Sequence, residues 1–373
     1  MRPEDRLAAI GGMRVLGFSI TMPFAGLALQ EDFGLTLGQV SAFYVALAAA
    51  GALGQVLGGL ASDRVGRVRS MVLGGAVASA SLTAAVLLWA PAVVELMIAV
   101  QAFFSNVYSV ASMALVGNYF NEHRGLVSAY GRVRVGSNLG WAVGIAVGGV
   151  LYSWIGFKGV VAVTSLLLAA SLVPLVGLRE PSSRGGSLVM EAPSRQMAIY
   201  LVPTFLTFII AGLMGYPLVQ YLSGVDGIST RFVGALLAVN GFMVVLLQDA
   251  IARRLGLVRP SVALATGMAV YGVGYAFMAF VRSLPEAAAD IVIITLGEMI
   301  VMPVSSAVAA ELSSPRSRGS HMGFYGIVNT LARNLSSSIY AESLYLMGPW
   351  GSWGLMSAVS LASSLGYLLT LGL

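Results

Sequence analysis

The feature that most constrains this chain is a series of long apolar segments that recurs along its whole length. Each is close to the roughly 20 mostly apolar residues that an α-helix needs to cross a bilayer. An outer-membrane barrel would instead show alternating segments of about ten residues. The sequence therefore predicts an all-α membrane protein with twelve transmembrane helices. We place them at residues 7–29, 36–61, 70–90, 92–118, 125–151, 155–178, 197–222, 231–252, 260–281, 285–311, 319–346 and 349–372.

The composition excludes several other classes of protein. Hydrophobic residues make up 57% of the chain and charged residues only 10%, whereas soluble domains carry about 25% charged residues. The chain has no cysteine and only two histidines, His123 and His321, so a disulfide framework and a thiolate or histidine metal centre are not expected. It also lacks a phosphate-binding loop, a metalloprotease motif and a nucleophile elbow. We predict a protein that is not an enzyme and has no cofactor and no metal.

The arrangement of basic residues predicts the topology. One predicted side of the membrane carries only Lys158, Arg231 and Arg282, and the other carries nearly all remaining basic loop residues. By the positive-inside rule the arginine-rich loops and both termini are cytoplasmic. The net charge of +5 is therefore a topology signal, and we expect a bilayer rather than a nucleic acid as the partner.

A polar stretch near the middle divides the chain. It lies at residues 179–196 and contains two prolines, two glycines and scattered charge, which predicts a cytoplasmic linker. The predicted domains are therefore two six-helix halves, at residues 1–178 and 197–373. Arg124-Gly125 and Arg318-Gly319 begin similar patterns in the two halves. Parallel half-repeats of this kind place a substrate site near the membrane midplane.

The loop after the second predicted span carries a recognisable motif. Its functional positions are Gly59, Asp63, Arg64, Gly66 and Arg67. This pattern resembles the loop between the second and third helices of the major facilitator superfamily. The resemblance implies two six-helix bundles related by pseudo-twofold symmetry, and transport by alternating access.

In that family the aspartate of the loop acts as a cytoplasmic gate by binding the start of the eleventh helix. Here that start lies near Arg318, Gly319 and Ser320. A carboxylate at a helix C-terminus is disfavoured by the helix dipole, so Asp63 needs a compensating partner. The alternative is an ordinary basic loop. The corresponding loop after the eighth span is degenerate, and Asp249 there is either a coupling residue or a local partner of Arg253.

Ionisable residues inside predicted spans mark candidate functional sites, since burying them in a membrane is costly. Glu298, Arg134 and Arg333 lie deepest, and Glu298 is the proton-coupling candidate because burial and an approaching arginine shift a carboxyl in opposite directions. Asp290 lies near the outer end of its span, where we expect an exposed charge at least as readily as a functional one. Arg132 faces away from Arg134 and is interpreted as an interhelical charge partner.

Polar residues three, four or seven apart share a helix face, and several such stripes accompany the deep charges. They predict a solute cavity, although hydrogen-bonded seams between helices are the alternative explanation for the serines and threonines. The substrate-cavity candidates are Arg14, Gln101, Arg134, Asn138, Trp141, Arg333 and Tyr340.

The fifth span also resembles that of the lactose permease group and of related proton symporters. That resemblance implies solute contacts for Arg134 and Trp141, but the position of the permease's partner carboxylate is near Val116, so sugar specificity is not supported. A second resemblance, to drug:proton antiporters, involves Gly297, Glu298, Pro303 and Arg318-Gly319. The antiporter Gly-Pro pair is missing, because Ile145 follows Gly144.

These observations predict a secondary active transporter of the plasma membrane that works as a monomer. We expect it to couple protons to the movement of a small organic solute, which the excess of deep arginines suggests is anionic. The first alternative is a multidrug efflux proton antiporter. A more remote one is a nonconducting receptor or scaffold on the same fold.

Overall fold

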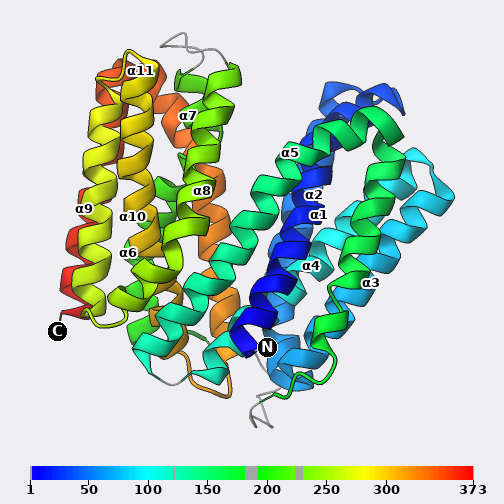
Figure 1. Cartoon of the computed structure of the whole chain (residues 1–373), viewed down its shortest axis with the longest axis horizontal. Coiled ribbons are helices and arrows are strands. Elements are labelled where there is room, and N and C mark those ends of the chain that lie inside the picture. Colours follow the sequence, from blue (N-terminus) through cyan, green and yellow to red (C-terminus); the bar gives the residue numbers. More distant parts are fainter. Residues whose placement is uncertain (1, 121, 181–191, 223–229, 373) are drawn as a thin grey trace. The chain divides into compact units, whose positions relative to one another are not determined.

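The computed structural model describes residues 2–120, 122–180, 192–222 and 230–372, and this part of the chain is helical with no strand. Ten of the described helices are long and apolar enough to cross a membrane. The predicted all-α membrane fold is thus confirmed. The helices (Figure 1) are α1 (Pro3–Glu31), α2 (Leu37–Val65), α3 (Arg67–Leu88), α4 (Pro91–Tyr119), α5 (His123–Ala170), α6 (Arg195–Gly212), α7 (Tyr216–Gln220), α8 (Thr230–Leu255), α9 (Pro260–Met278), α10 (Leu284–Glu311) and α11 (Arg318–Leu371), with a short 3₁₀ helix, η1 (Val173–Leu175).

Two helices are long enough to contain two spans each. The α5 helix is interrupted at Gly156 (φ 65°) and α11 at Gly348 (φ 65°). Positive φ is readily adopted by glycine and costly for other residues, so glycine is suited to both interruptions. Gly348 lies between the predicted eleventh and twelfth spans, and Gly156 is the second residue of the predicted sixth span, next to the predicted break. Counting each part separately, the ten long helices supply twelve spans.

The predicted sixth and seventh spans differ from the helices observed. The sixth was expected to reach residue 178, but α5 ends at Ala170 and is followed by η1. Pro174 explains part of this difference, because proline has no N–H to continue a helix. The seventh span is divided between α6 and α7, with Pro217 in the first turn of α7.

The contacts of the chain define two compact units. Unit 1 comprises Met1–Asn121, Arg132–Ala192 and Ser313–Phe324. Unit 2 comprises Glu122–Gly131, Pro193–Leu312 and Tyr325–Leu373. The start of α5 therefore packs within unit 2, and the start of α11 packs within unit 1. The predicted linker at 179–196 lies largely outside the described residues, and the predicted domain boundaries stay a prediction.

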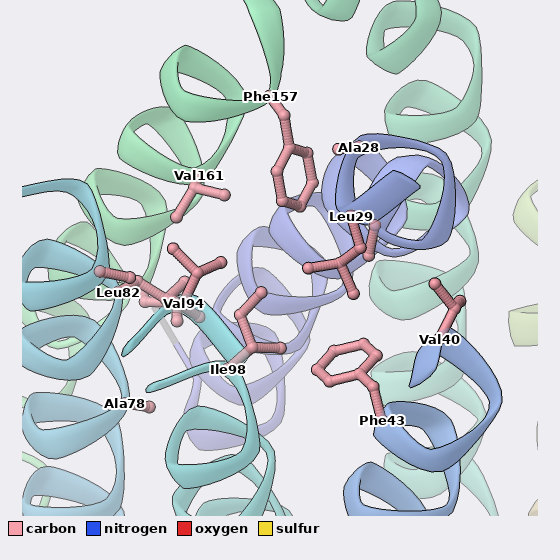
Figure 2. Packing of buried hydrophobic residues seen from close by; sticks show 13 residues of the cluster. Ala28, Leu29, Val40, Phe43, Ala78, Leu82, Val94, Ile98, Phe157 and Val161 are labelled. Carbon is pink, nitrogen blue, oxygen red and sulfur yellow. The ribbon is translucent and has the colours of Figure 1, made fainter. Parts of the chain in front are cut away.

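Unit 1 has a mainly aliphatic core that also contains two buried phenylalanines, one from α2 and one from α5. Leu29 of α1, Phe43 of α2, Leu82 of α3, Ile98 of α4 and Phe157 of α5 converge in it (Figure 2), and all are at most 4% exposed. Close packing of this kind replaces the hydrophobic effect as the main attraction between helices inside a bilayer.

Unit 2 is joined by short polar contacts between helices. Ser357, Ser360 and Ser364 of α11 donate hydrogen bonds to backbone carbonyl oxygens of α9 at 2.7–2.8 Å. Serine allows helices to approach closely and satisfies its own hydroxyl in a medium without water. The α9 and α10 helices lie side by side in this unit (Figure 1).

Candidate functional site

Asp63, near the C-terminal end of α2, is bound by the start of α11. Its Oδ1 accepts a hydrogen bond from the backbone N–H of Gly319 at 2.8 Å. Its Oδ2 accepts from the backbone N–H of Ser320 at 2.7 Å and from the Ser320 hydroxyl at 2.8 Å. The start of a helix offers free N–H groups and a positive dipole end, which favour a carboxylate. The contact thus supplies the compensation that the end of α2 does not offer.

Arg67 links this carboxylate to two further segments of unit 1. Its side chain is fully buried, and Nη2 donates to Asp63 Oδ1 at 3.2 Å and to the carbonyl oxygen of Pro315 at 2.8 Å. Glu180 Oε1 accepts from the Arg67 backbone N–H at 3.0 Å and lies 3.4 Å from Nη1. Sequence reasoning missed Glu180 and Pro315, because both are far from the motif in the chain. The only signal for Glu180 was an acidic residue beside an arginine-containing linker.

The two glycines of the motif allow close approach. A β-carbon on Gly59 would lie 2.6 Å from the carbonyl oxygen of Gly319, and one on Gly66 would lie 2.9 Å from a carboxylate oxygen of Glu180. Gly66 also has a φ of 102°, which disfavours other residues. Arg64 is exposed. Four of the five predicted gate positions therefore take part in one buried contact, and Arg64 does not.

Arg318 adds a second contact between α11 and unit 1. Its Nη1 donates to the carbonyl oxygen of Gly117, and it donates to Asn118 Oδ1 at 2.7 Å. Both residues lie in the last turn of α4, where backbone carbonyl groups such as that of Gly117 have no partner within the helix. The first turn of α11 is thus tied to the ends of both α2 and α4.

The end of α8 in unit 2 is built differently. Asp249 forms a local ion pair with Arg253 at 2.5 Å, and the two side chains are 28% and 57% exposed. This is the local pairing that the sequence offered as one of two alternatives. The end of α8 packs directly against α5 instead of binding it through a buried carboxylate. A β-carbon on Gly131 of α5 would lie 2.6 Å from the Ala252 β-carbon of α8.

A histidine–glutamate pair also joins α5 to α10 within unit 2. His123 Nδ1 lies 2.7 Å from Glu311 Oε1, and both side chains are partly exposed. His123 begins α5 and Glu311 ends α10. A cation is disfavoured at a helix start and an anion at a helix end, so when the histidine is protonated each residue compensates the other.

The deep charges of unit 1 lie in two places. Arg14 of α1 is 9% exposed, donates to Ser105 Oγ of α4 at 3.0 Å and lies 3.8 Å from the centre of the Tyr108 ring. Gln101 donates to the same Ser105 oxygen at 2.9 Å. Within the described ranges, Arg14 Nη1 has no hydrogen-bond partner. The predicted candidates Arg14 and Gln101 are therefore brought together, around a serine that was not among the cavity candidates.

The candidates on α5 form a separate, more accessible group. Arg134 and Asn138 are partly exposed, and Asn138 Nδ2 donates to the backbone carbonyl of Arg134 at 3.0 Å. Trp141 is 43% exposed and its ring stacks on Phe18 at 6.3 Å. Arg132 forms an ion pair with Asp5 of α1 at 2.6 Å, which confirms its interpretation as an interhelical partner.

Glu298 of α10 is anchored by a polar side chain of α8. Asn240 Nδ2 donates to Glu298 Oε2 at 2.8 Å and to Thr295 Oγ1 at 3.1 Å. Thr295 is fully buried and Glu298 is partly exposed. The Glu298 side chain is therefore partly accessible from outside the protein, while the neutral amide of Asn240 fixes its position.

Arg333 of α11 is held by neutral groups. Its Nε donates to Asn329 Oδ1 at 2.8 Å and its Nη1 to the carbonyl oxygen of Ala211 at 3.0 Å. It also lies 5.8 Å from the centre of the Phe208 ring and 3.9 Å from Met302 Sδ. Met302 is one helical turn from Glu298, so Arg333 and Glu298 share one region of unit 2. In the described part of the chain, the hydrogen bonds of Arg333 thus go to an amide oxygen and a backbone carbonyl, not to a carboxylate.

Two residues of unit 2 are more deeply packed than the sequence suggested. Tyr340, a predicted cavity residue, is fully buried with its ring 4.7 Å from that of Trp353. Asp290 lies near a helix end, where an exposed charge was expected at least as readily as a functional one, and it is only 3% exposed. Among the described residues, neither of its buried carboxyl oxygens has a hydrogen-bond partner. Position along a helix gives depth but not the direction in which a side chain points, so the sequence left both alternatives open.

Comparison with known proteins decides the family. A sequence model described as Major Facilitator Superfamily matches residues 7–337. The chain belongs to the Major Facilitator Superfamily. A relative in Bacillus subtilis (strain 168), named "Uncharacterized MFS-type transporter YttB", is 26% identical over 334 residues, which cover 86% of this chain and 83% of the relative.

Solved structures of other Major Facilitator Superfamily (MFS) proteins have the same fold. The human organic anion transporter MFSD10 gives a TM-score of 0.85 at 17% identity, covering 98% of this chain and 100% of that chain. The Escherichia coli fucose:proton symporter FucP, in its N162A form, gives 0.79 at 10% identity, with 99% and 98% covered. At these identities the likeness shows the fold alone. As an MFS protein, this chain is a multi-pass membrane transporter rather than an enzyme.

Proposed function

We propose that this MFS protein is a proton-coupled secondary active transporter of a small organic anion. The observation that carries the proposal is Arg333, a partly exposed guanidinium at membrane depth that contacts an amide, a backbone carbonyl, a sulfur and a ring, all of them neutral. A charge at that depth is costly unless it is compensated. A carboxylate or phosphate of the solute would compensate it through charge-assisted hydrogen bonds.

Glu298 is the residue we propose for proton coupling. It lies in the same region as Arg333, and its anchor Asn240 is neutral and can remain hydrogen-bonded whether the carboxyl is charged or protonated. Movement of Arg333 toward Glu298 would favour the carboxylate, and movement away would favour the acid. Binding of the anion at Arg333 would thereby change the affinity of Glu298 for a proton.

The contact between Asp63 and the start of α11 is the proposed gate. It must form and break in each alternating-access cycle. Two of its three donors are backbone N–H groups at the start of α11, so the hydrogen bonds can re-form whenever the ends of the two helices meet. We further propose that this end of the molecule is cytoplasmic, that the membrane is the plasma membrane, and that the working unit is a monomer. The arginine-rich loops support the orientation.

Transport by purified protein in liposomes under an imposed pH gradient tests the proposal. The solute panel contains carboxylates, phosphate esters, neutral sugars and lipophilic cations. We expect uptake of an anion, and a loss of roughly 10- to 100-fold in Arg333→Gln, because a hydrogen bond to a charged group contributes about 1.5–3 kcal/mol. Arg254→Gln, an exposed arginine at the end of α8, is the matched control.

Glu298→Gln separates coupling from binding. This variant should still exchange anion for anion but should no longer accumulate it against a gradient by using protons. Full proton-driven accumulation by Glu298→Gln would remove Glu298 from the coupling role. Transport of lipophilic cations with no response to anions would instead support the multidrug alternative.

A further inference from the structure

Arg14 is the centre of a polar cluster inside unit 1. It lies near the middle of α1, and its neighbours Gln101, Ser105 and Tyr108 lie in the central turns of α4. Arg14, Gln101 and Tyr108 are at most 9% exposed, whereas Ser105 is partly exposed. The guanidinium is therefore a charge at membrane depth that is shielded from water, and such a charge is costly unless it is compensated.

The contacts of this guanidinium supply no negative charge. Nη2 donates to Ser105 Oγ at 3.0 Å, and Cζ lies 3.8 Å from the centre of the Tyr108 ring. The ring attracts a cation but has no net charge. It covers one face of the guanidinium and leaves the N–H groups along the edge for an acceptor. Gly75 of α3 lies close to Nη1, since a β-carbon there would be 3.4 Å away, and it offers no side chain.

The carboxylates of the surrounding helices are out of reach of Arg14. The α3 helix contains no acidic residue. On α1, Asp5 lies nine residues before Arg14, about 13 Å along the axis at 1.5 Å per residue, and it pairs with Arg132. On α4, Glu95 lies ten residues before Ser105, about 15 Å by the same measure. Within the described residues, the charge of Arg14 thus has no acidic neighbour.

Three donors of the cluster lack an acceptor in the part of the chain that the structure describes. Arg14 Nη1 and the Tyr108 hydroxyl are buried without a hydrogen-bond partner. Ser105 Oγ accepts from Arg14 at 3.0 Å and from Gln101 at 2.9 Å. Its two lone pairs are therefore used, and its own hydrogen remains to be donated. Water would bring further hydrogens to donate and no charge, whereas a bare anion only accepts and also neutralises the guanidinium.

We propose that this cluster binds one halide ion, chloride in particular, inside unit 1. The ion accepts from Arg14 Nη1 and from the hydroxyls of Ser105 and Tyr108. It enters past Ser105, the member of the cluster that is partly exposed. A halide brings no carbon atoms that would have to fit among these buried side chains. The site is separate from Arg333 in unit 2, and it does not rest on the proposed transport of an organic anion.

Thermal unfolding in matched salts tests the proposal. The protein in lipid nanodiscs is unfolded in sodium gluconate, and chloride or bromide then replaces gluconate at constant ionic strength. Gluconate is too large to enter the cluster. A ligand that binds only the folded state multiplies the folding constant by 1 + [L]/Kd, about elevenfold at ten times Kd. We expect a saturable rise in melting temperature with halide. Equal melting temperatures in chloride and gluconate would overturn the proposal and assign the cluster to water.

Two variants and a control assign the response to the cluster. Arg14→Gln should abolish the halide response, because it removes the charge. Arg64→Gln, an exposed arginine of the same unit, should retain it. Tyr108→Phe keeps the ring beneath the guanidinium and removes one donor, so the halide concentration at half-effect should rise about tenfold or more. This second variant decides the matter if Arg14→Gln does not assemble. A halide response that neither variant changes would refute the site.

Crystals grown in sodium bromide locate the ion, because bromide scatters X-rays anomalously. We expect an anomalous peak beside Arg14 Nη1, and its absence there would contradict the proposal. A transported organic anion that raises the melting temperature through Arg14, while halides do not, would assign the cluster to the solute and reject the halide site. Halide binding in a protein that moves no solute on a pH gradient would keep the site and reject the proposed function.

Discussion

The ends of α2 and α8 hold corresponding positions in the two halves of the chain, yet they contact their neighbours by different chemistry. At the end of α2, a buried aspartate binds the backbone of α11 and is supported by the buried Arg67. At the end of α8, Asp249 pairs locally with the exposed Arg253, and a glycine–alanine contact brings α5 close. At the end of α8, a buried carboxylate is therefore not required for α8 and α5 to pack together.

This difference has a consequence for how the two contacts separate. Hydrogen bonds to a carboxylate are short-range and directional, so the α2 contact is lost sharply once the carboxylate leaves the N–H groups. The α8 contact depends on shape, and it is sensitive to added volume rather than to charge. Each contact should therefore respond to a different class of substitution.

The largest effect is expected from Asp63→Asn. Removing one partner of a buried ion pair costs about 3–5 kcal/mol, and the amide cannot accept equivalently from both N–H groups while facing Arg67. The natural chain has no cysteine, so a single cysteine at Met322, which is 1% exposed, reports opening of the α2 contact. Thiol labelling of this cysteine should become about a hundredfold faster.

Arg64→Gln is the matched control, since Arg64 belongs to the same motif but is exposed. It should leave labelling at position 322 unchanged. Equal labelling rates in the Asp63→Asn and native backgrounds would mean that the carboxylate does not hold α2 against α11.

A smaller effect is expected from Gly131→Leu, which adds volume where α5 meets α8. Its β-carbon would lie 2.6 Å from that of Ala252, and overpacking costs about 1–3 kcal/mol. At about 2–4 °C per kcal/mol the melting temperature should fall by several degrees. Gly354→Leu, at a position with no neighbour within 4 Å, should not lower it comparably. Equal responses would show that volume is not what limits the α8 contact.

The smallest effect is expected from Asp249→Asn. An exposed i, i+4 ion pair contributes about 0.3–0.5 kcal/mol, so the melting temperature should change by no more than about 2 °C. Arg253→Gln should have a similar effect, because both variants break the same pair. A loss of folding free energy in Asp249→Asn close to the about 3–5 kcal/mol expected for Asp63→Asn would contradict the difference between the two helix ends.

The contact between Asp63 and α11 shows how far the motif could be interpreted from sequence. Asp63 and its contact region near Ser320 were predicted, because a family resemblance and a helix-dipole argument both applied to one short segment. Glu180 was not predicted, although it accepts hydrogen bonds from Arg67 and Val68. Its distance along the chain, and the absence of any periodic pattern in a linker, left only its charge as a signal, and charge alone did not indicate which residue it contacts.

The amino-acid sequence by itself predicted the twelve spans, with breaks close to Gly156 and Gly348, and the motif that resembles that of the superfamily. These depend on local properties, namely apolar length and the spacing of a short motif, whereas the positive φ at the two glycines came from the structure. Only the tertiary structure decided which charges have partners. Asp63 accepts three hydrogen bonds from α11, Arg333 is held by neutral groups, and Asp290 has no hydrogen-bond partner among the described residues. The reason is geometric, because sequence position sets how deep a residue lies, whereas packing sets the rotation of its helix and the neighbours it faces.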